Sequence, residues 1–211
     1  DQAWILSEAR KHHSVITLIH QQVPLLPAKF GSAFATDDDV REAIRRSSDA
    51  MLDRLNTLEG CDEWAAHVYL EVNDVQRVVL ARDPELQALS AELDSASEGR
   101  KYMMKQQVQS RMRDAIERFE ASLADGVLNS LRPMTVDFQA EPPRDPSAVP
   151  EGETEIAQAS MLVRRDQADR FIELAERTNQ ETAEVWLQIT GPWPAYSFAQ
   201  LGSDNEVVRY G

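Results

Sequence analysis

Apolar residues recur every three or four positions in several stretches of the chain, and this spacing predicts amphipathic helices. The expected helices cover residues 3–22, 37–59, 73–82, 84–95, 98–131 and 166–178. Gly60 follows the second helix as a C-cap, and Pro133 stops the longest one. That longest helix carries an apolar stripe from Met104 to Val127, which we expect to pack across a sheet.

Other stretches are short and rich in alternating apolar and polar residues, which favours half-buried strands. We expect strands over residues 63–72, 134–140, 156–164 and 184–190. Residues 23–35 contain Pro24, Pro27 and Gly31 and are typical of an extended segment or turn. Residues 141–155 hold four prolines and five acidic residues, so we expect a poorly packed, solvated loop.

The order of these elements predicts an α+β fold in two domains. From residue 61 onward the order is strand, helices, strand, strand, helix, strand, which is the β-α-β-β-α-β pattern of a ferredoxin-like domain. Its antiparallel sheet should carry helices on one face, with residues 73–95 as a helical insertion. We therefore expect an N-terminal α+β domain over 1–60, the ferredoxin-like domain over 61–198, and a C-terminal tail, 199–211, that packs on the N-terminal domain.

The net charge of the chain limits the classes of partner that it can bind. The 211 residues include 22 basic and 36 acidic ones, for a net charge of −14. Nucleic acids and anionic membranes are poor partners for such a chain, because both need clustered basic residues. No apolar run reaches the roughly 20 residues of a membrane span. Cys61 is the only cysteine, which excludes an internal disulfide and fits a reducing compartment.

No group of residues has the spacing of a catalytic or metal site. His13 and His20 are seven residues apart on one helix, about 10 Å along its axis, which is too far for one metal ion. The sequence contains no P-loop, no GxGxxG, no CxxC and no GxSxG. We therefore expect no enzyme activity, no cofactor and no bound metal.

Residues 191–198 place Trp193, Tyr196 and Phe198 among two prolines and Gly191, directly after the last strand. Two interpretations stay open: a rigid junction between the domains, or an exposed aromatic surface that binds a partner. We expect strand pairing to stop near Thr190, because proline cannot donate a ladder hydrogen bond. We also expect Trp193 and Phe198 to be buried against the N-terminal domain.

Three segments together resemble the GvpL/GvpF family of gas vesicle proteins. They are the His13 helix leading into residues 23–31 (VPLLPAKFG), residues 99–103 (GRKYM) at the start of the long helix, and residues 191–198 (GPWPAYSF). Their order and spacing match the family across nearly the whole chain. The family often has Arg at the position of Lys29. It usually begins with an apolar strand before the first helix, so we expect N-terminal strands to be missing here.

The resemblance implies a cytoplasmic accessory or minor structural protein that binds the small hydrophobic gas vesicle shell protein and other accessory proteins. It brings no cofactor and no catalytic residue. The candidate partner-binding or domain-junction residues are Pro27, Phe30, Gly31, Tyr102, Gly191, Trp193, Tyr196 and Phe198. The alternative is a regulatory ligand-binding module, by analogy with other ferredoxin-like sheets. An exposed apolar surface without an enclosed polar pocket would favour the accessory protein.

Overall fold

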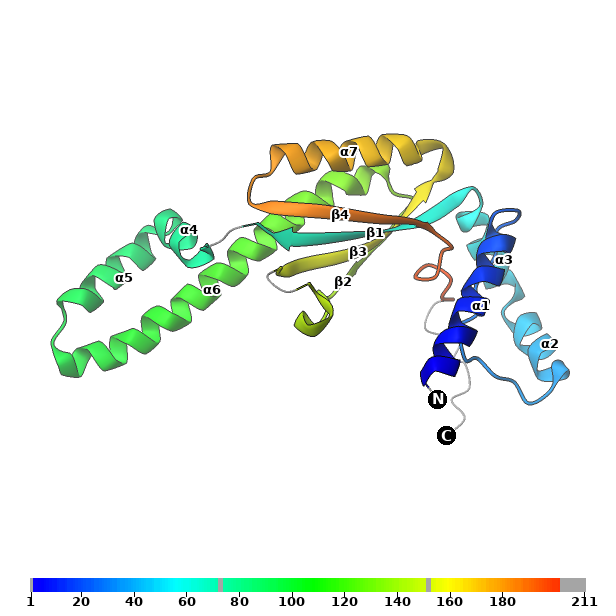
Figure 1. Cartoon of the computed structure of the whole chain (residues 1–211), viewed down its shortest axis with the longest axis horizontal. Coiled ribbons are helices and arrows are strands. Elements are labelled where there is room, and N and C mark those ends of the chain that lie inside the picture. The colour runs from blue at the N-terminus through cyan, green and yellow to red at the C-terminus, as the bar shows by residue number, and fades with distance from the viewer. Residues whose placement is uncertain (1, 72–73, 151–152, 202–211) are drawn as a thin grey trace.

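The computed structural model describes residues 2–71, 74–150 and 153–201. This part of the chain is α+β, with seven α-helices and one four-stranded antiparallel sheet (Figure 1). The strands are β1 (Cys61–Leu70), β2 (Asp137–Glu141), β3 (Glu155–Arg164) and β4 (Val185–Trp193). Their order across the sheet is β2-β3-β1-β4, so the first and third strands lie in the centre.

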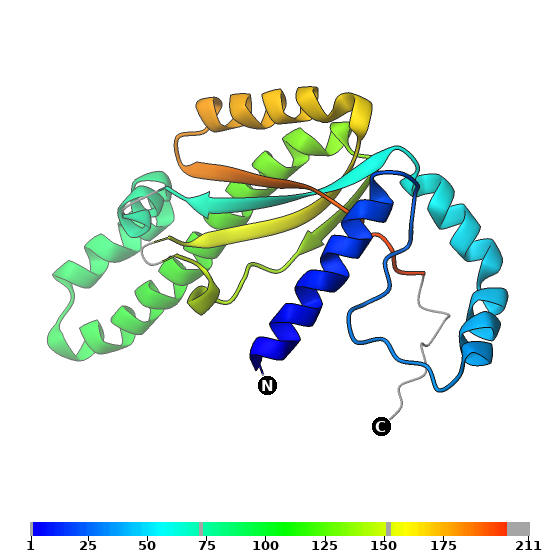
Figure 2. The same ribbon diagram turned by 45° about the vertical axis from the view of Figure 1, so that its right-hand side comes forward.

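Two helices cover one face of this sheet. They are the C-terminal half of α6 (Glu98–Leu131) and the whole of α7 (Ala168–Glu181), which lie on the same side of the strands in Figures 1 and 2. Alternate strand residues meet them in the main core, which is built from Trp64, Ala66, Val68, Val127, Leu128, Leu131, Ala159, Met161, Val163, Phe171, Ala175, Val185 and Leu187. The period-two pattern of the strands thus decides which face is buried.

Helix α7 also covers part of the edge strand β4. The side-chain amide of Asn179 donates to the carbonyl oxygen of Leu187 (2.8 Å) and accepts from its N–H (2.7 Å). Exposed edge strands can pair with other chains through such backbone groups. The contact therefore satisfies the outward-facing backbone groups of Leu187.

The N-terminal half of α6 does not pack on the sheet, which corrects the expectation for the Met104–Val127 stripe. At 34 residues the helix is about 51 Å long, against about 33 Å for the ten-residue β1. The excess length packs instead with α4 (Val75–Arg82) and α5 (Pro84–Ser95) around a separate cluster of Val79, Leu86 and Ala115. These three helices form an arm that projects from the sheet (Figure 1).

The opposite end of the molecule holds α1 (Gln2–His20), α2 (Asp37–Arg46) and α3 (Ser48–Leu58) (Figure 1). We expected one helix over 37–59, but it breaks at Ser47, whose N–H is shared between the carbonyls of Ala43 and Ile44. Serine competes for backbone hydrogen bonds and adds no apolar surface to hold the helix together there. Ile44 is accordingly exposed, and of α2 and α3 only Leu58 is buried.

The loop between β2 and β3 is better packed than its composition predicts. The backbone N–H and the guanidinium of Arg144 both donate to the buried carboxylate of Glu155, at 2.9 Å each. A short 3-10 turn, Pro146–Ala148, follows. The expected tail over 199–211 falls mostly on residues 202–211, outside the described residues.

Candidate functional site

Residues 191–198 continue β4 and then turn across the end of the sheet toward α1. Strand pairing does not stop at Thr190 as expected: Trp193 pairs with Glu63, and Thr190 pairs with Ala65. A bulge accommodates Gly191 and Pro192, so the proline does not have to donate within the ladder. Gly191 has φ +141°, and a Cβ there would lie 2.9 Å from the carbonyl oxygen of Glu63, so only glycine fits without displacement.

Glu63 fixes the segment by two hydrogen bonds to Ser197. One carboxylate oxygen accepts the Ser197 N–H at 2.8 Å, and the other accepts its hydroxyl at 2.7 Å. Glu63 is buried, on the sheet face that α6 and α7 leave uncovered. Ser160 on β3 lies 3.0 Å from the Ser197 hydroxyl, which extends the network to the next strand.

Phe198 fills a second, smaller core under this segment. Its side chain is fully buried, with Leu58 from α3, Cys61, Leu162 and Ala195 as neighbours. Arg54 of α3 donates to the Phe198 carbonyl oxygen and forms an ion pair with Asp137 at 3.0 Å. This core therefore joins the N-terminal helices to the sheet.

Histidines hold α1 against the rest of the chain. His13 Nδ1 lies 2.8 Å from the Tyr196 hydroxyl, and its ring centroid is 5.9 Å from that of Trp193. His20 lies 2.7 Å from a carboxylate oxygen of Asp62, which also accepts a hydrogen bond from Arg165. Among the described residues of α1, only Ile16 adds a buried apolar side chain. The attachment of α1 is thus largely polar and aromatic.

The structure brings together most of the candidate residues predicted from the sequence. Gly191, Trp193, Tyr196 and Phe198 form the segment at the end of β4, and the ring of Phe30 contacts His12 at 5.6 Å between centroids. Pro27 is partly buried, while Phe30 and Gly31 lie exposed in the segment between α1 and α2. Tyr102 is the exception, because it lies in the arm.

The burial of the aromatic residues differs from expectation at one position. Phe198 is fully buried, but Trp193 is 41% exposed, and its ring lies beside that of His13 on α1. The bulge at Gly191 and Pro192 leaves Trp193 at the sheet margin instead of under the N-terminal helices. The segment therefore combines a buried residue with an exposed one.

Sequence reasoning missed the residues that fix this segment, above all Glu63 and Arg54. A signal for Glu63 was present, since a glutamate directly before the apolar residues 64–66 of a strand has to find hydrogen-bond donors when it is buried. No comparable signal marked Arg54, because an arginine on an amphipathic helix ordinarily faces solvent.

We expect Glu63→Gln to remove a component of the pH dependence of stability. Burial raises the pKa of Glu63 above its ordinary value of 4.5, although the hydrogen bonds from Ser197 act in the opposite direction. Because the folded state favours the protonated carboxyl, this contribution to stability is complete below pH 4.5 and is lost as the pH rises through the raised pKa.

Urea unfolding at several pH values from about 4 to 8 measures this directly. The free energy of unfolding of the wild type, relative to that of Glu63→Gln, should fall as the pH rises. The same change at the exposed Glu173 on α7 serves as the control. A wild-type curve parallel to that of Glu63→Gln would show that Glu63 does not titrate as described.

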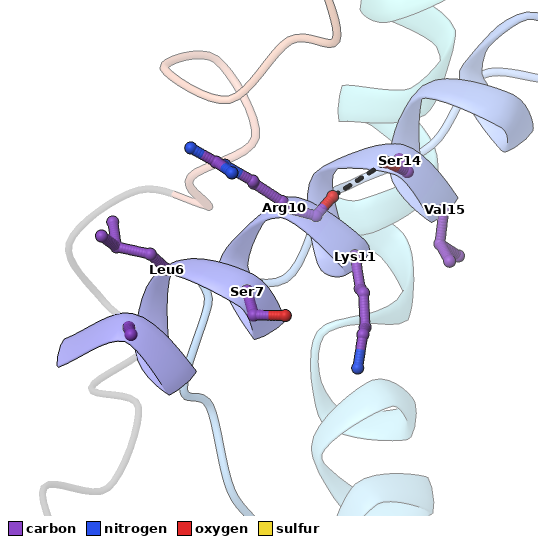
Figure 3. A pocket seen from close by; sticks show the side chains of 7 residues that line it. Leu6, Ser7, Arg10, Lys11, Ser14 and Val15 are labelled. Carbon is purple, nitrogen blue, oxygen red and sulfur yellow. Dashed lines mark hydrogen bonds between the residues drawn. The ribbon is translucent and has the colours of Figure 1, made fainter. Parts of the chain in front are cut away.

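The outer face of α1 carries an open depression rather than an enclosed pocket (Figure 3). Its lining comes from this helix alone: Ala3, Leu6, Ser7, Arg10, Lys11, Ser14 and Val15. Among the described residues, no group of three or more His, Cys, Asp or Glu could hold a metal ion. None of the described helices is long and apolar enough to cross a membrane.

Known proteins resemble the chain along most of its length. The sequence model of the family described as "Gas vesicle synthesis protein GvpL/GvpF" matches residues 3–200. Gas vesicle protein F of Streptomyces sp. (strain CB03234) is 30% identical over 189 residues, which are 90% of this chain and 76% of that protein. Gas vesicle protein L of the same strain is 26% identical over 207 residues, 97% of this chain and 73% of that protein.

Two crystal structures share the fold. GvpF from Anabaena sp. PCC7120 superposes with a TM-score of 0.70 at 15% identity, over 90% of this chain and 76% of that one. GvpF from Microcystis aeruginosa superposes with a TM-score of 0.64 at 16% identity, over 89% of this chain and 75% of that one. The family is one of gas vesicle proteins and not a known class of enzyme. The chain therefore belongs to the GvpL/GvpF family of gas vesicle proteins.

Proposed function

We propose that the protein is an accessory or minor structural component of the gas vesicle that binds the shell protein and supports vesicle assembly in the cytoplasm. One observation carries this proposal: exposed large apolar side chains concentrate at the N-terminal end of the described chain. Nine of the fifteen lie there. They are Trp4, Ile5, Leu6, Val15, Leu18, Ile19, Val23, Phe30 and Phe34, and we call them the N-terminal apolar surface.

This surface suits a hydrophobic protein partner. Exposed apolar patches that persist on a folded protein mark interaction sites, and a small hydrophobic shell protein is a partner of matching chemistry. The depression along α1 lies on the same helix and is open to solvent (Figure 3). Its lining mixes apolar and polar side chains of one helix, and it does not enclose a ligand as a small-molecule site does.

The segment 191–198 extends the surface in this proposal. The exposed ring of Trp193 lies beside His13, and Tyr196 is hydrogen-bonded to the same histidine. The exposed Phe30, with Pro27 and Gly31, completes the group on the chain between α1 and α2. The buried side chain of Phe198 holds the segment in place through its contacts in the second core.

We further propose the domain division that the sequence suggests. Residues 61–198 would form a ferredoxin-like domain, with α4 and α5 as its insertion and residues 1–60 as the N-terminal domain. The strand order β2-β3-β1-β4 and the position of α6 and α7 on one face support the ferredoxin-like assignment.

A pull-down with purified shell protein tests the function. We expect Leu18→Asp to reduce binding at least about tenfold, because it places a charge in the N-terminal apolar surface where a partner has to exclude water. The matched control is Leu52→Asp on α3, since Leu52 is 59% exposed and Leu18 is 60% exposed. Thermal melting should confirm that both variants fold.

Undiminished binding by Leu18→Asp would overturn the assignment of this surface. Equal loss of binding in both variants would also overturn it, since a general effect of added charge would then explain the result. No binding by the wild type would overturn the proposed function itself.

A further inference from the structure

The arm formed by α4, α5 and α6 carries a second exposed surface at the start of α6. Tyr102 and Met103 are 71% and 73% exposed, the largest fractions among the exposed large hydrophobic residues of the described chain. The start of α6 lies at the tip of the arm, at the opposite end of the molecule from α1 (Figure 1). The N-terminal apolar surface does not include this position.

The surroundings of Tyr102 are basic, in a chain whose net charge is −14. Five basic and no acidic residues lie between Gly99 and Arg113. Arg100 and Arg111 are bound to α5, through Glu92 at 2.6 Å and Glu85 at 3.3 Å. Lys105 and Arg113 are exposed and have no ion-pair partner within the part of the chain that the structure describes.

These side chains form a continuous stripe along the helix. Tyr102, Gln106, Gln109 and Arg113 follow the i, i+4, i+7, i+11 spacing, so they share one face of α6, and all four are exposed. Lys105 lies beside them, three residues after Tyr102. The stripe spans about 16 Å along the axis, or three helical turns. A straight row of this length matches the contact surface of a second helix.

We propose that this stripe binds an acidic helix of another protein. Tyr102 would bury against apolar residues of that helix, and Lys105 and Arg113 would pair with its carboxylates. Tyrosine and arginine are among the residues enriched at such contacts. The net charge of −14 opposes a nucleic acid or an anionic membrane, and it also opposes a second copy of this chain. The proposal rests on the proposed gas vesicle function only for the choice of cells in which the experiment is carried out.

A photo-crosslinking phenylalanine analogue in place of Gln106, in gas-vesicle-forming cells, identifies the segment that lies on the stripe. We expect an acidic segment of a different protein.

That segment, made as a peptide, should bind the purified protein in fluorescence anisotropy, and it should bind more weakly at higher salt. Lys105→Glu with Arg113→Glu should weaken binding at least about tenfold. The control pair Arg41→Glu and Arg45→Glu on α2 changes the net charge equally and should leave binding nearly unchanged.

The test separates the partner classes. A crosslink to nucleic acid, to lipid or to a second copy of this chain would overturn the proposal, and so would no crosslink at all. A captured segment without carboxylates, or binding equally sensitive to both charge-reversal pairs, would overturn it as well. None of these outcomes depends on the pull-down with the shell protein, so the two proposals can fail separately.

Discussion

Phe198→Ala is expected to destabilise the protein by about 3–5 kcal/mol, the usual cost of removing a fully buried phenylalanine side chain. Phe198 is fully buried, and its neighbours Leu58, Cys61 and Leu162 come from α3, β1 and β3. These elements are fixed by their own contacts, so they cannot collapse fully into the space that the ring leaves. The Arg54 hydrogen bond to the backbone carbonyl of residue 198 can persist in the variant. The expected loss therefore comes from packing and from the contact of the Arg54 guanidinium with the ring, whose centroid is 5.9 Å away.

Urea unfolding measures this loss, and Trp193→Ala is the matched comparison. Trp193 belongs to the same segment but is 41% exposed, so we expect its truncation to cost only about 1–2 kcal/mol. This is below the 3–5 kcal/mol expected for a buried ring in this segment. Equal losses in the two variants, or a loss below about 1 kcal/mol for Phe198→Ala, would contradict a core centred on Phe198.

The sequence predicts secondary structure well where local signals and packing agree. The helix over 98–131 was predicted with the bounds observed for α6, because its apolar period is regular and Pro133 follows it. The helix expected over 37–59 is divided at Ser47, where a continuous apolar stripe suggested no break. Periodicity reports which residues can share a face, but not whether a partner surface exists for that face.

The sequence was less informative about which element each apolar face packs against. The stripe of α6 is apolar from end to end, yet its two halves pack against different elements. The deciding quantity is the length of α6 relative to the strands, which becomes clear only once the sheet is assembled. Similarly, residues 191–198 were recognised as a candidate site, but their attachment depends on Glu63 and Arg54, which lie more than 130 residues away in sequence.

The loop between β2 and β3 shows how composition can mislead about packing. Its prolines and acidic residues indicated a poorly packed, solvated loop. In the structure, Arg144 lies over Tyr69 and donates to the carboxylate of Glu155, whose side chain has no exposed surface. His67 contacts the other carboxylate oxygen at 2.6 Å. A single arginine therefore connects the loop to a buried acid on the sheet.

Arg144→Ala should destabilise the protein by about 2–4 kcal/mol, because the buried carboxylate of Glu155 loses a charged partner that is itself one-third exposed. Burial alone would raise the pKa of Glu155, but hydrogen bonds from Arg144 and His67 outweigh it and lower the pKa below 4.5. The stability that Glu155 contributes is therefore present above pH 4.5 and is lost as the pH falls through the lowered pKa.

Without Arg144 the pKa of Glu155 rises, so acid unfolding should begin at a higher pH in the variant than in the wild type. Urea unfolding at neutral pH and an acid titration followed by circular dichroism measure the two effects. Arg164→Ala is the control, because Arg164 pairs with Asp166 where both side chains are more than half exposed, so water screens the pair and its loss should change stability little. If Arg144→Ala changed the free energy of unfolding no more than this control, the contact between the loop and Glu155 would not stabilise the fold. His67 would then be a sufficient partner for the buried carboxylate of Glu155.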